Sequence, residues 1–117
     1  TMENITIYHN PLWGKSRKTL QLLRDNGVEP TIVEYLKNVP TIEAFQSLGR
    51  KLNMRPAEFV RKGEAMFKEN NLKDKLEDDK ALFEAMNQFP KIMERPIIVR
   101  GEKAVLGRPP ENILDLI

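Results

Sequence analysis

The sequence predicts an α/β fold built on a four-stranded mixed sheet with helices around it. Three observations lead to this prediction. A strand, a full helix and a second strand follow one another near the start, the middle has helical periodicity only, and the C-terminal third returns to a strand period before a last helix. The resulting order is β-α-β, helices, β-β-α, which a four-stranded mixed sheet satisfies most simply.

The β-α-β unit at the start is predicted from alternation and from helix-end signals. Residues 5–8 alternate β-branched with polar or aromatic side chains, and residues 31–35 form a second strand-like run. Between them, residues 16–26 carry two leucines on one side, and Gly27 ends this helix. Because a full helix separates the two strands, we expect them to be parallel, with a right-handed crossover.

The middle of the chain, from about residue 41 to 90, is predicted to be a helical insertion. Its apolar residues recur three or four positions apart, which is typical of helices with one buried side. The predicted elements are a helix over 42–52 capped by Thr41, a short helix from Pro56 to Val60, a solvated polar connection over 68–79, and a helix over 81–89 that ends at Pro90.

The C-terminal third is predicted to form a hairpin and a final helix. Residues 97–99 and 104–106 are strand-like runs that flank a four-residue hairpin loop, 100–103. Pro109-Pro110 then opens a helix whose apolar residues are Ile113, Leu114 and Ile117. The whole order matches a thioredoxin-like fold with a helical insertion, although periodicity alone leaves other α/β folds open.

Composition narrows the possible functions of these 117 residues, which have room for one domain, 1–117. Nineteen basic and 17 acidic residues give a net charge of +2, too balanced for a nucleic-acid-binding surface. No apolar run approaches the roughly 18 residues of a membrane span, and no signal peptide opens the chain, so we expect a soluble cytoplasmic protein with no membrane partner. The absence of cysteine excludes thiol chemistry, and with one histidine no metal site is expected.

The loop that follows the first strand, residues 9–17, leads into a helix N-terminus. Unpaired backbone N–H groups and the positive end of the helix dipole meet there, so this position favours an anion. Gly14 and Ser16 lie at the helix start, and Lys15 and Arg17 could add donors. An ordinary turn with a capping serine explains the same residues, and spacing alone favours that simpler interpretation.

Several motifs occur together over nearly the whole chain, from Ile5 to Ile117. They are Tyr8-His9-Asn10-Pro11, Ser16-Arg17, Glu34-Tyr35-Leu36, Val60-Arg61-Lys62, Glu94-Arg95-Pro96 and Gly107-Arg108-Pro109-Pro110. In this order and spacing the sequence resembles the ArsC family, the glutaredoxin-dependent arsenate reductases. The resemblance implies the thioredoxin-like fold with a helical insertion, and a cis peptide bond before Pro96.

The resemblance also implies a catalytic cysteine that attacks arsenate and is then regenerated by glutathione and glutaredoxin, with no bound cofactor. The matching positions are Trp13 for the cysteine, His9 close to it, and Arg61, Arg95 and Arg108 for the arginines that bind the oxyanion. An indole has no accessible lone pair for this attack. We therefore expect a chain that can bind a small oxyanion such as arsenate but does not reduce it.

Some alternatives stay open. The three arginines could be separate surface residues with ordinary ion pairs, and Trp13 could fill the pocket, stack on an arginine or point outward. His9, without a thiol to assist, is more often a structural hydrogen-bonding residue. The alternative function is a non-catalytic protein-interaction or regulatory module like the related Spx regulators, which use this fold to bind RNA polymerase; a glutaredoxin-like or other protein partner is then expected. A single recent change from Cys to Trp at position 13 is a third explanation.

Overall fold

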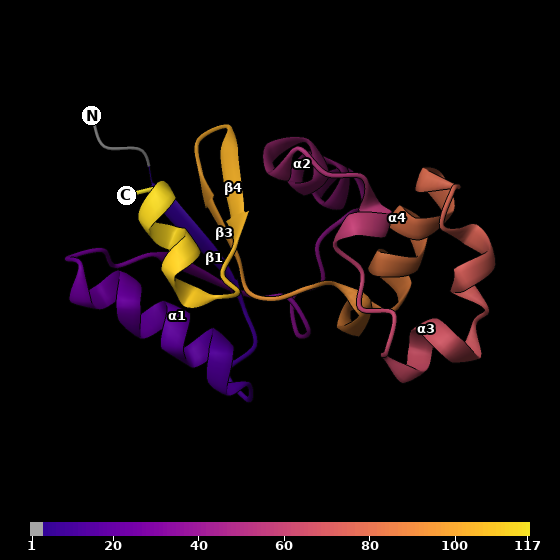
Figure 1. The fold of residues 1–117 in the computed structure, drawn as a ribbon, viewed down its shortest axis with the longest axis horizontal. Coiled ribbons are helices and arrows are strands. Elements are labelled where there is room, and N and C mark those ends of the chain that lie inside the picture. Colours follow the sequence, from indigo (N-terminus) through magenta and orange to yellow (C-terminus); the bar gives the residue numbers. More distant parts are fainter. Residues whose placement is uncertain (1–3) are drawn as a thin grey trace. The chain divides into compact units, whose positions relative to one another are not determined.

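The computed structural model describes residues 4–117, and it confirms the α/β prediction (Figure 1). The helices and strands are β1 Ile5–His9, α1 Gly14–Asp25, β2 Thr31–Glu34, α2 Ile42–Leu52, α3 Ala65–Glu69, α4 Asp79–Gln88, β3 Ile97–Arg100 and β4 Lys103–Leu106, with short 3-10 helices η1 Pro56–Glu58, η2 Leu72–Lys75, η3 Pro90–Ile92 and η4 Pro110–Asp115. The chain divides into two compact units: a sheet unit of residues 4–38 and 95–117, and a helical unit of residues 39–94.

The four strands form one mixed sheet in the order β2-β1-β3-β4. β1 is parallel to β2, as the helix between them requires, and antiparallel to β3, which pairs in turn with β4. Both the four-stranded mixed sheet and the parallel β-α-β unit are therefore confirmed.

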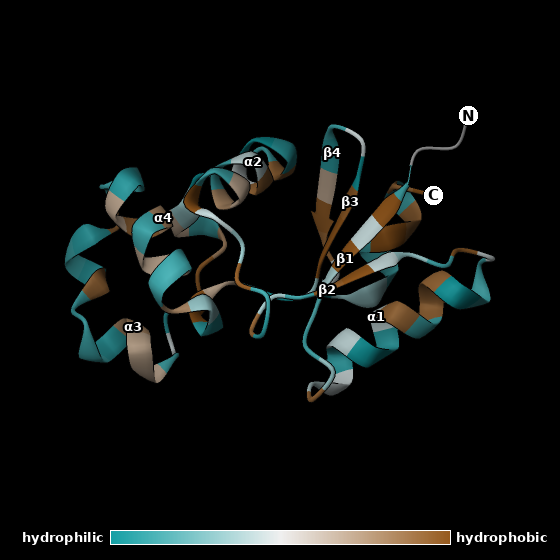
Figure 2. Ribbon diagram, turned by 180° about the vertical axis from the view of Figure 1, so that it is seen from behind, coloured by the Kyte–Doolittle hydropathy of each residue, from teal (hydrophilic) through white to brown (hydrophobic). Residues whose placement is uncertain are grey.

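The core of the sheet unit lies on one face of the sheet, under α1 and η4 (Figure 2). The buried apolar side chains of this core are Ile5, Ile7 and Ile98 from the strands, Leu20 and Leu23 from α1, and Ile113 and Leu116 from η4. Gly27 adopts a positive φ of 78° just after α1, which confirms it as the helix stop. This packing fixes the N-terminal end of α1 beside the end of β1, where the predicted site lies.

In the helical unit, the capping predicted for α2 is present. The Thr41 hydroxyl accepts a hydrogen bond from the Ala44 N–H at 3.1 Å, and the Asp78 carboxylate accepts one from the Ala81 N–H at the start of α4. The apolar stripes of α2 and α4 are buried and pack together, including Met86.

Two short elements, the hairpin loop and the helix after Pro56, differ from their predictions. Arg100 pairs with Lys103, so the hairpin loop has two residues instead of four, and Gly101 adopts the left-handed conformation that such a tight turn requires. The helix after Pro56 is only three residues long, because Val60 leaves it to form an isolated bridge with Met93. In the hairpin, pairing between the two adjacent strands outweighs local polarity, and after Pro56 the bridge to the distant Met93 outweighs helix propensity.

The segment 68–79 is not simply a solvated connection. It contains the end of α3 and all of η2, and Leu72 is buried in it, as is Phe67 directly before it. The last helix is a 3-10 helix that buries Ile113 and Leu116, three residues apart as that helix type requires, while Leu114 and Ile117 are exposed. In both segments, only some of the apolar residues are buried and carry the packing.

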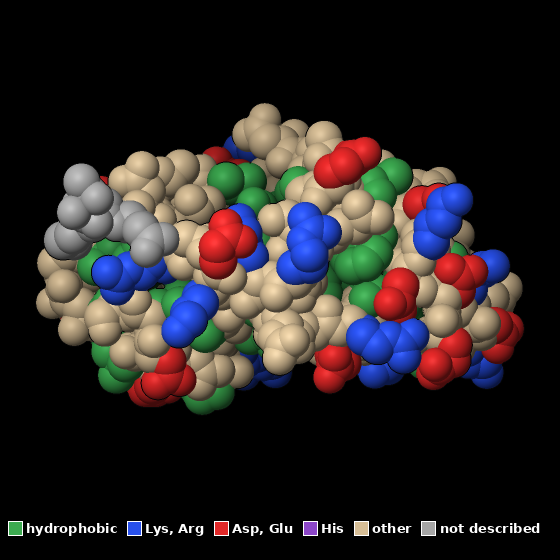
Figure 3. Space-filling model, turned by 90° about the horizontal axis from the view of Figure 1, so that it is seen from above, with side chains coloured by type: hydrophobic (Ala, Val, Ile, Leu, Met, Phe, Trp, Pro, Cys, Tyr) green, Lys and Arg blue, Asp and Glu red, His purple; other side chains and the backbone are tan. Residues whose placement is uncertain are grey.

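Among residues 4–117, no helix combines the length and apolarity that crossing a membrane would need. On the face drawn in Figure 3, basic and acidic side chains are interspersed.

Candidate functional site

The loop between β1 and α1 is a closely hydrogen-bonded turn. The Trp13 N–H donates to the Asn10 carbonyl at 3.1 Å, and the Arg17 N–H donates to the Trp13 carbonyl at 3.0 Å. The Asn10 side-chain oxygen accepts from the Leu12 N–H at 3.1 Å, which forms an Asx turn. Trp13 is thereby held in extended conformation as the N-cap residue of α1, directly at the positive end of the helix dipole.

A buried polar cluster lies beneath this turn. Nδ1 of His9 lies 2.6 Å from the Ser16 hydroxyl oxygen, and the same oxygen accepts the Asn10 N–H at 3.1 Å. All three residues are buried. His9 and Ser16 therefore tie the end of β1 to the first turn of α1, and the structural role considered for His9 agrees with this geometry.

Burial lowers the pKa of His9 below its ordinary value, outweighing the opposite effect of the nearby Glu34 carboxylate. As the pH falls, the His9 imidazole is therefore protonated at a higher pH in the unfolded chain than in the folded protein. We predict that the free energy of unfolding is highest above about pH 6.5 and declines below it, in the range where an unfolded histidine becomes protonated.

Because His9 is the only histidine, denaturant unfolding of the His9→Gln variant isolates this dependence. Between neutral pH and about pH 5.5, above the range where most carboxylates titrate, the variant should show a flatter pH profile than the unaltered chain. Equal slopes for the two proteins would contradict the prediction.

Trp13 stacks on Arg95. The guanidinium carbon of Arg95 lies 3.1 Å from the centroid of the Trp13 ring. Arg95 is only 5% exposed, whereas Trp13 is 38% exposed. Of the three placements considered for Trp13, the structure therefore combines two: one face of the indole covers the arginine, and part of the ring faces solvent.

Arg95 and Arg108 sit next to a direct backbone contact. The Gly107 N–H donates to the Pro96 carbonyl at 2.8 Å, so the residues just before β3 and just after β4 are held together. The peptide bonds Arg95–Pro96 and Arg108–Pro109 are both cis, and the first of these confirms the expectation for Pro96. The Arg108 side chain is exposed.

Arg61 belongs to the helical unit, where its guanidinium forms an ion pair with Glu64. Nη1 of Arg61 donates to a Glu64 carboxylate oxygen at 3.0 Å. This is the kind of ordinary ion pair that the alternative interpretation of the arginines requires. Its role in oxyanion binding stays a prediction.

At the helix start, Gly14 is the first residue of α1 and is exposed, while the Ser16 hydroxyl is engaged by His9 and Asn10. Sequence reasoning missed two residues that shape the site. Gly107 is buried between strand ends, and Thr19 on α1 donates to its carbonyl at 3.0 Å. Gly107 belongs to one of the family motifs, but no local sequence signal indicates a glycine that side chains from distant segments surround.

Within residues 4–117 there is no group of three or more His, Cys, Asp or Glu side chains that could hold a metal ion. The described site instead consists of a helix N-terminus, a buried His–Ser pair and a stacked arginine. The helix N-terminus and the arginine can attract an anion, because the first carries partial positive charge and the second a full positive charge.

The fold and this loop define a thioredoxin-like α/β protein of the arsenate reductase type. The family model described as ArsC family matches residues 8–116, and the chain belongs to this family. The Escherichia coli K12 protein called uncharacterized protein YfgD is 45% identical to it over 98% of each chain. An arsenate reductase of Haemophilus influenzae is 38% identical over 97% of this chain and 99% of its own.

Solved structures agree with this assignment. The structure titled arsenate reductase from Vibrio cholerae matches with a TM-score of 0.95 at 40% identity, covering 100% of both chains. The thioredoxin-like fold and the resemblance to the ArsC family are thus confirmed, the family match over residues 8–116.

Proposed function

We propose that this chain is an ArsC-family protein that binds a tetrahedral oxyanion of the arsenate or phosphate type at Arg95 and does not reduce it. The observation that carries the proposal is the stacking of Trp13 on Arg95. Trp13 occupies the position of the family's nucleophilic cysteine, and the centroid of its ring lies 3.1 Å from the guanidinium carbon of the arginine that would bind the oxyanion. Reduction of arsenate needs two electrons, and a chain without cysteine has no thiol to supply them.

Stacking and oxyanion binding use different parts of a guanidinium. The indole covers its face, whereas an oxyanion is bound by the N–H groups that point outward in its plane. Trp13 can therefore hold Arg95 in orientation without removing its binding edge. The N-terminus of the 12-residue α1 adds a second attraction for negative charge at the same loop.

Trp13 is the only tryptophan, so its fluorescence reports on this site alone. Titration with arsenate, phosphate or sulfate should change the emission in a saturable way, with calorimetry as an independent readout. Arg95→Ala should abolish binding, and Arg95→Lys should weaken it by about tenfold or more because an ammonium lacks the planar pair of donors.

The matched control is Arg24→Ala, which removes an exposed arginine that pairs with Glu29 elsewhere in the sheet unit. It should leave anion affinity unchanged. The proposal is overturned if neither emission nor heat changes at millimolar anion, or if binding survives in the Arg95→Ala variant.

A second candidate function is protein interaction, the Spx-like alternative. Leu12 is 84% exposed beside the partly exposed Trp13, and a small cavity of about 170 Å³, with Leu36 among its lining residues, lies next to this loop. Exposed apolar side chains beside a small cavity are typical of interfaces, where tryptophan is enriched.

Purified glutaredoxin and RNA polymerase are the partners to test, with Leu12→Asp as the variant. If the protein binds either partner with micromolar affinity, if Leu12→Asp weakens that binding, and if anions produce no response, the interaction module is favoured over the oxyanion-binding function. Failure of both proteins to bind, together with saturable anion binding, would reject it.

A further inference from the structure

The helical unit contains a cavity that the site described above does not use. Its volume is about 460 Å³, within the range of ordinary ligand pockets. The residues that line it are Lys62, Phe67, Lys68, Asn71, Lys73 and Leu76. All of them belong to one continuous segment, so the cavity is formed within the helical unit.

The backbone around the cavity is fixed by a tight reversal between α3 and η2. Asn71 adopts a left-handed conformation with φ of 54°, its N–H donates to the Lys68 carbonyl at 3.2 Å, and its carbonyl accepts from the Asp74 N–H at 3.2 Å. Phe67 is buried on this segment and Leu76 is half-buried. The cavity therefore has an apolar wall on a backbone held by its own hydrogen bonds.

The charges at this cavity have a single sign. Three lysines line it and no acidic residue does. Lys62 Nζ donates to the Ala57 carbonyl at 3.3 Å, and within the described part of the chain none of Lys62, Lys68 and Lys73 forms an ion pair with a carboxylate. An occupant with a negative charge would thus meet ammonium groups that are not held in ion pairs with carboxylates.

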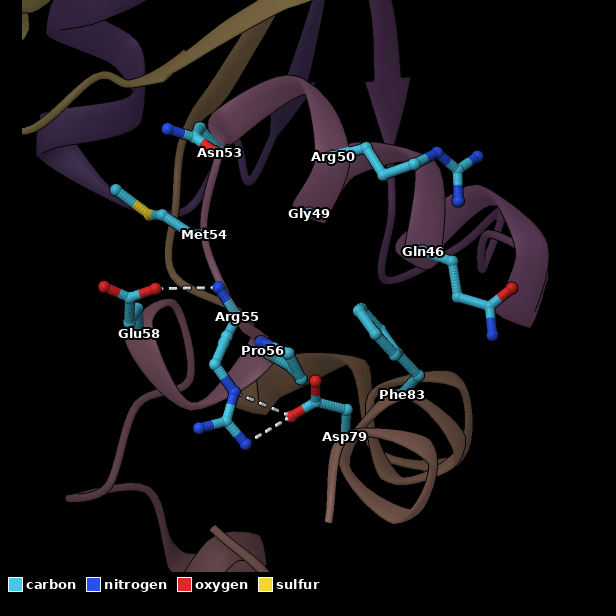
Figure 4. A pocket seen from close by; sticks show the side chains of 10 residues that line it. All are labelled: Gln46, Gly49, Arg50, Asn53, Met54, Arg55, Pro56, Glu58, Asp79 and Phe83. Atoms are coloured by element: carbon cyan, nitrogen blue, oxygen red, sulfur yellow. Dashed lines mark hydrogen bonds and ion pairs between the residues drawn. The ribbon is translucent and has the colours of Figure 1, made fainter. Parts of the chain in front are cut away.

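The larger cavity of the same unit, about 590 Å³, differs in this respect (Figure 4). There the guanidinium of Arg55 donates to one Asp79 carboxylate oxygen from both Nε and Nη2, at 3.1 and 2.8 Å. The wall of that cavity carries acidic as well as basic side chains, and Arg55 is paired with Asp79, so it does not present charge of a single sign to a ligand.

We propose that the lysine-rimmed cavity binds a small organic anion with an apolar body and one anionic head group. The apolar body would lie against Phe67 and Leu76, and the head group would lie among the lysines. Lysine ammonium groups are compact charges with no planar pairing requirement, so a carboxylate, sulfonate or phosphate head would serve. The proposal is independent of oxyanion binding at Arg95, which belongs to the sheet unit.

The probe for the test is 8-anilinonaphthalene-1-sulfonate, followed by calorimetry, with octanoate, phenyl phosphate and the neutral octanamide as competitors. We expect saturable one-to-one binding that octanoate or phenyl phosphate displaces and octanamide does not. The competitors distinguish an aliphatic carboxylate from an aromatic phosphate as the preferred form. Higher ionic strength should weaken binding, since the lysines are exposed.

Two variants separate the charge from the apolar wall. Lys68→Gln with Lys73→Gln should weaken binding by about tenfold or more, and Leu76→Ser should weaken it without removing the preference for anions. The matched control, Lys18→Gln with Lys103→Gln, removes two exposed lysines of the sheet unit and should have no effect.

The proposal is overturned if octanamide displaces the probe as effectively as octanoate does. It is also overturned if the lysine double variant and the control variant bind the probe with equal affinity. Absence of saturable binding would do the same. Because Arg95→Ala leaves this cavity intact, loss of anion binding at the sheet unit does not affect these outcomes.

Discussion

Replacing Trp13 with cysteine is expected to raise arsenate reduction by on the order of a thousandfold or more over the unaltered chain, because losing a catalytic nucleophile typically costs at least that much. The rate is measured as arsenite formed with glutathione and glutaredoxin, the reductants that the resemblance implies. The surrounding site supplies what the thiol needs: the N-cap position of α1, the buried His9–Ser16 pair and Arg95.

The physical basis of this gain is stabilisation of a thiolate. A cysteine at position 13 would sit at the N-terminus of a 12-residue helix and beside the Arg95 guanidinium that now stacks on the indole. Both would stabilise negative charge on sulfur, so the thiol pKa should lie below its ordinary value of about 8.5. The pH dependence of alkylation by iodoacetamide measures this pKa directly.

Trp13→Ser is the matched control, since it opens the same space without a thiol, and it should stay at background. Two results would contradict the prediction. An ordinary thiol pKa in Trp13→Cys would mean that the loop does not stabilise charge. A depressed pKa without arsenate reduction would mean that the oxyanion is not bound where the sulfur can reach it.

Gly107→Ala is expected to destabilise the protein by roughly 1–3 kcal/mol, the usual cost of overpacking a filled core. A Cβ at this position would lie 2.8 Å from each of three side-chain atoms, on Thr19, Pro96 and Ile98. All three residues are buried, so none can move aside without displacing its own neighbours. Urea unfolding measures the loss as a lower midpoint at unchanged slope.

Gly63→Ala is the control, because a Cβ there would meet nothing within 4 Å. Its effect should be near zero or slightly stabilising. If Gly107→Ala proves as stable as Gly63→Ala, the close packing of the strand ends next to Arg95 and Arg108 is wrong. Weaker anion binding in Gly107→Ala is also expected, since Gly107 holds these strand ends together through Pro96.

Much of the fold could be predicted because its elements carry local signals. The alternation before the loop, the Gly27 stop of α1, the Thr41 cap of α2 and the stripe of α4 are all properties of neighbouring residues, whereas no side chain caps the N-terminus of α1. The two-residue hairpin turn and the packing of the segment after Phe67 could not be predicted in this way. The first depends on cross-strand pairing of Arg100 with Lys103, and the second on the burial of Leu72 within a stretch of polar and charged residues.

The site was predictable as a set of residue types but not as a set of contacts. The motifs singled out His9, Trp13 and the arginines, yet only the structure pairs His9 with Ser16 and Trp13 with Arg95. These pairs join residues separated by seven positions in one case and by most of the chain in the other. The spacing of residues along a sequence carries no information about a contact such as that of Trp13 with Arg95, which joins distant parts of the chain.

The most direct test of the central claim is the initial rate of arsenite formation by the unaltered protein, with arsenate, glutathione and glutaredoxin, compared with the same mixture without it. We predict that the two rates are equal, while Trp13 fluorescence in the same preparation still responds to arsenate. A rate above the protein-free mixture that scales with protein concentration would contradict the claim that the chain keeps an oxyanion site but has lost the chemistry.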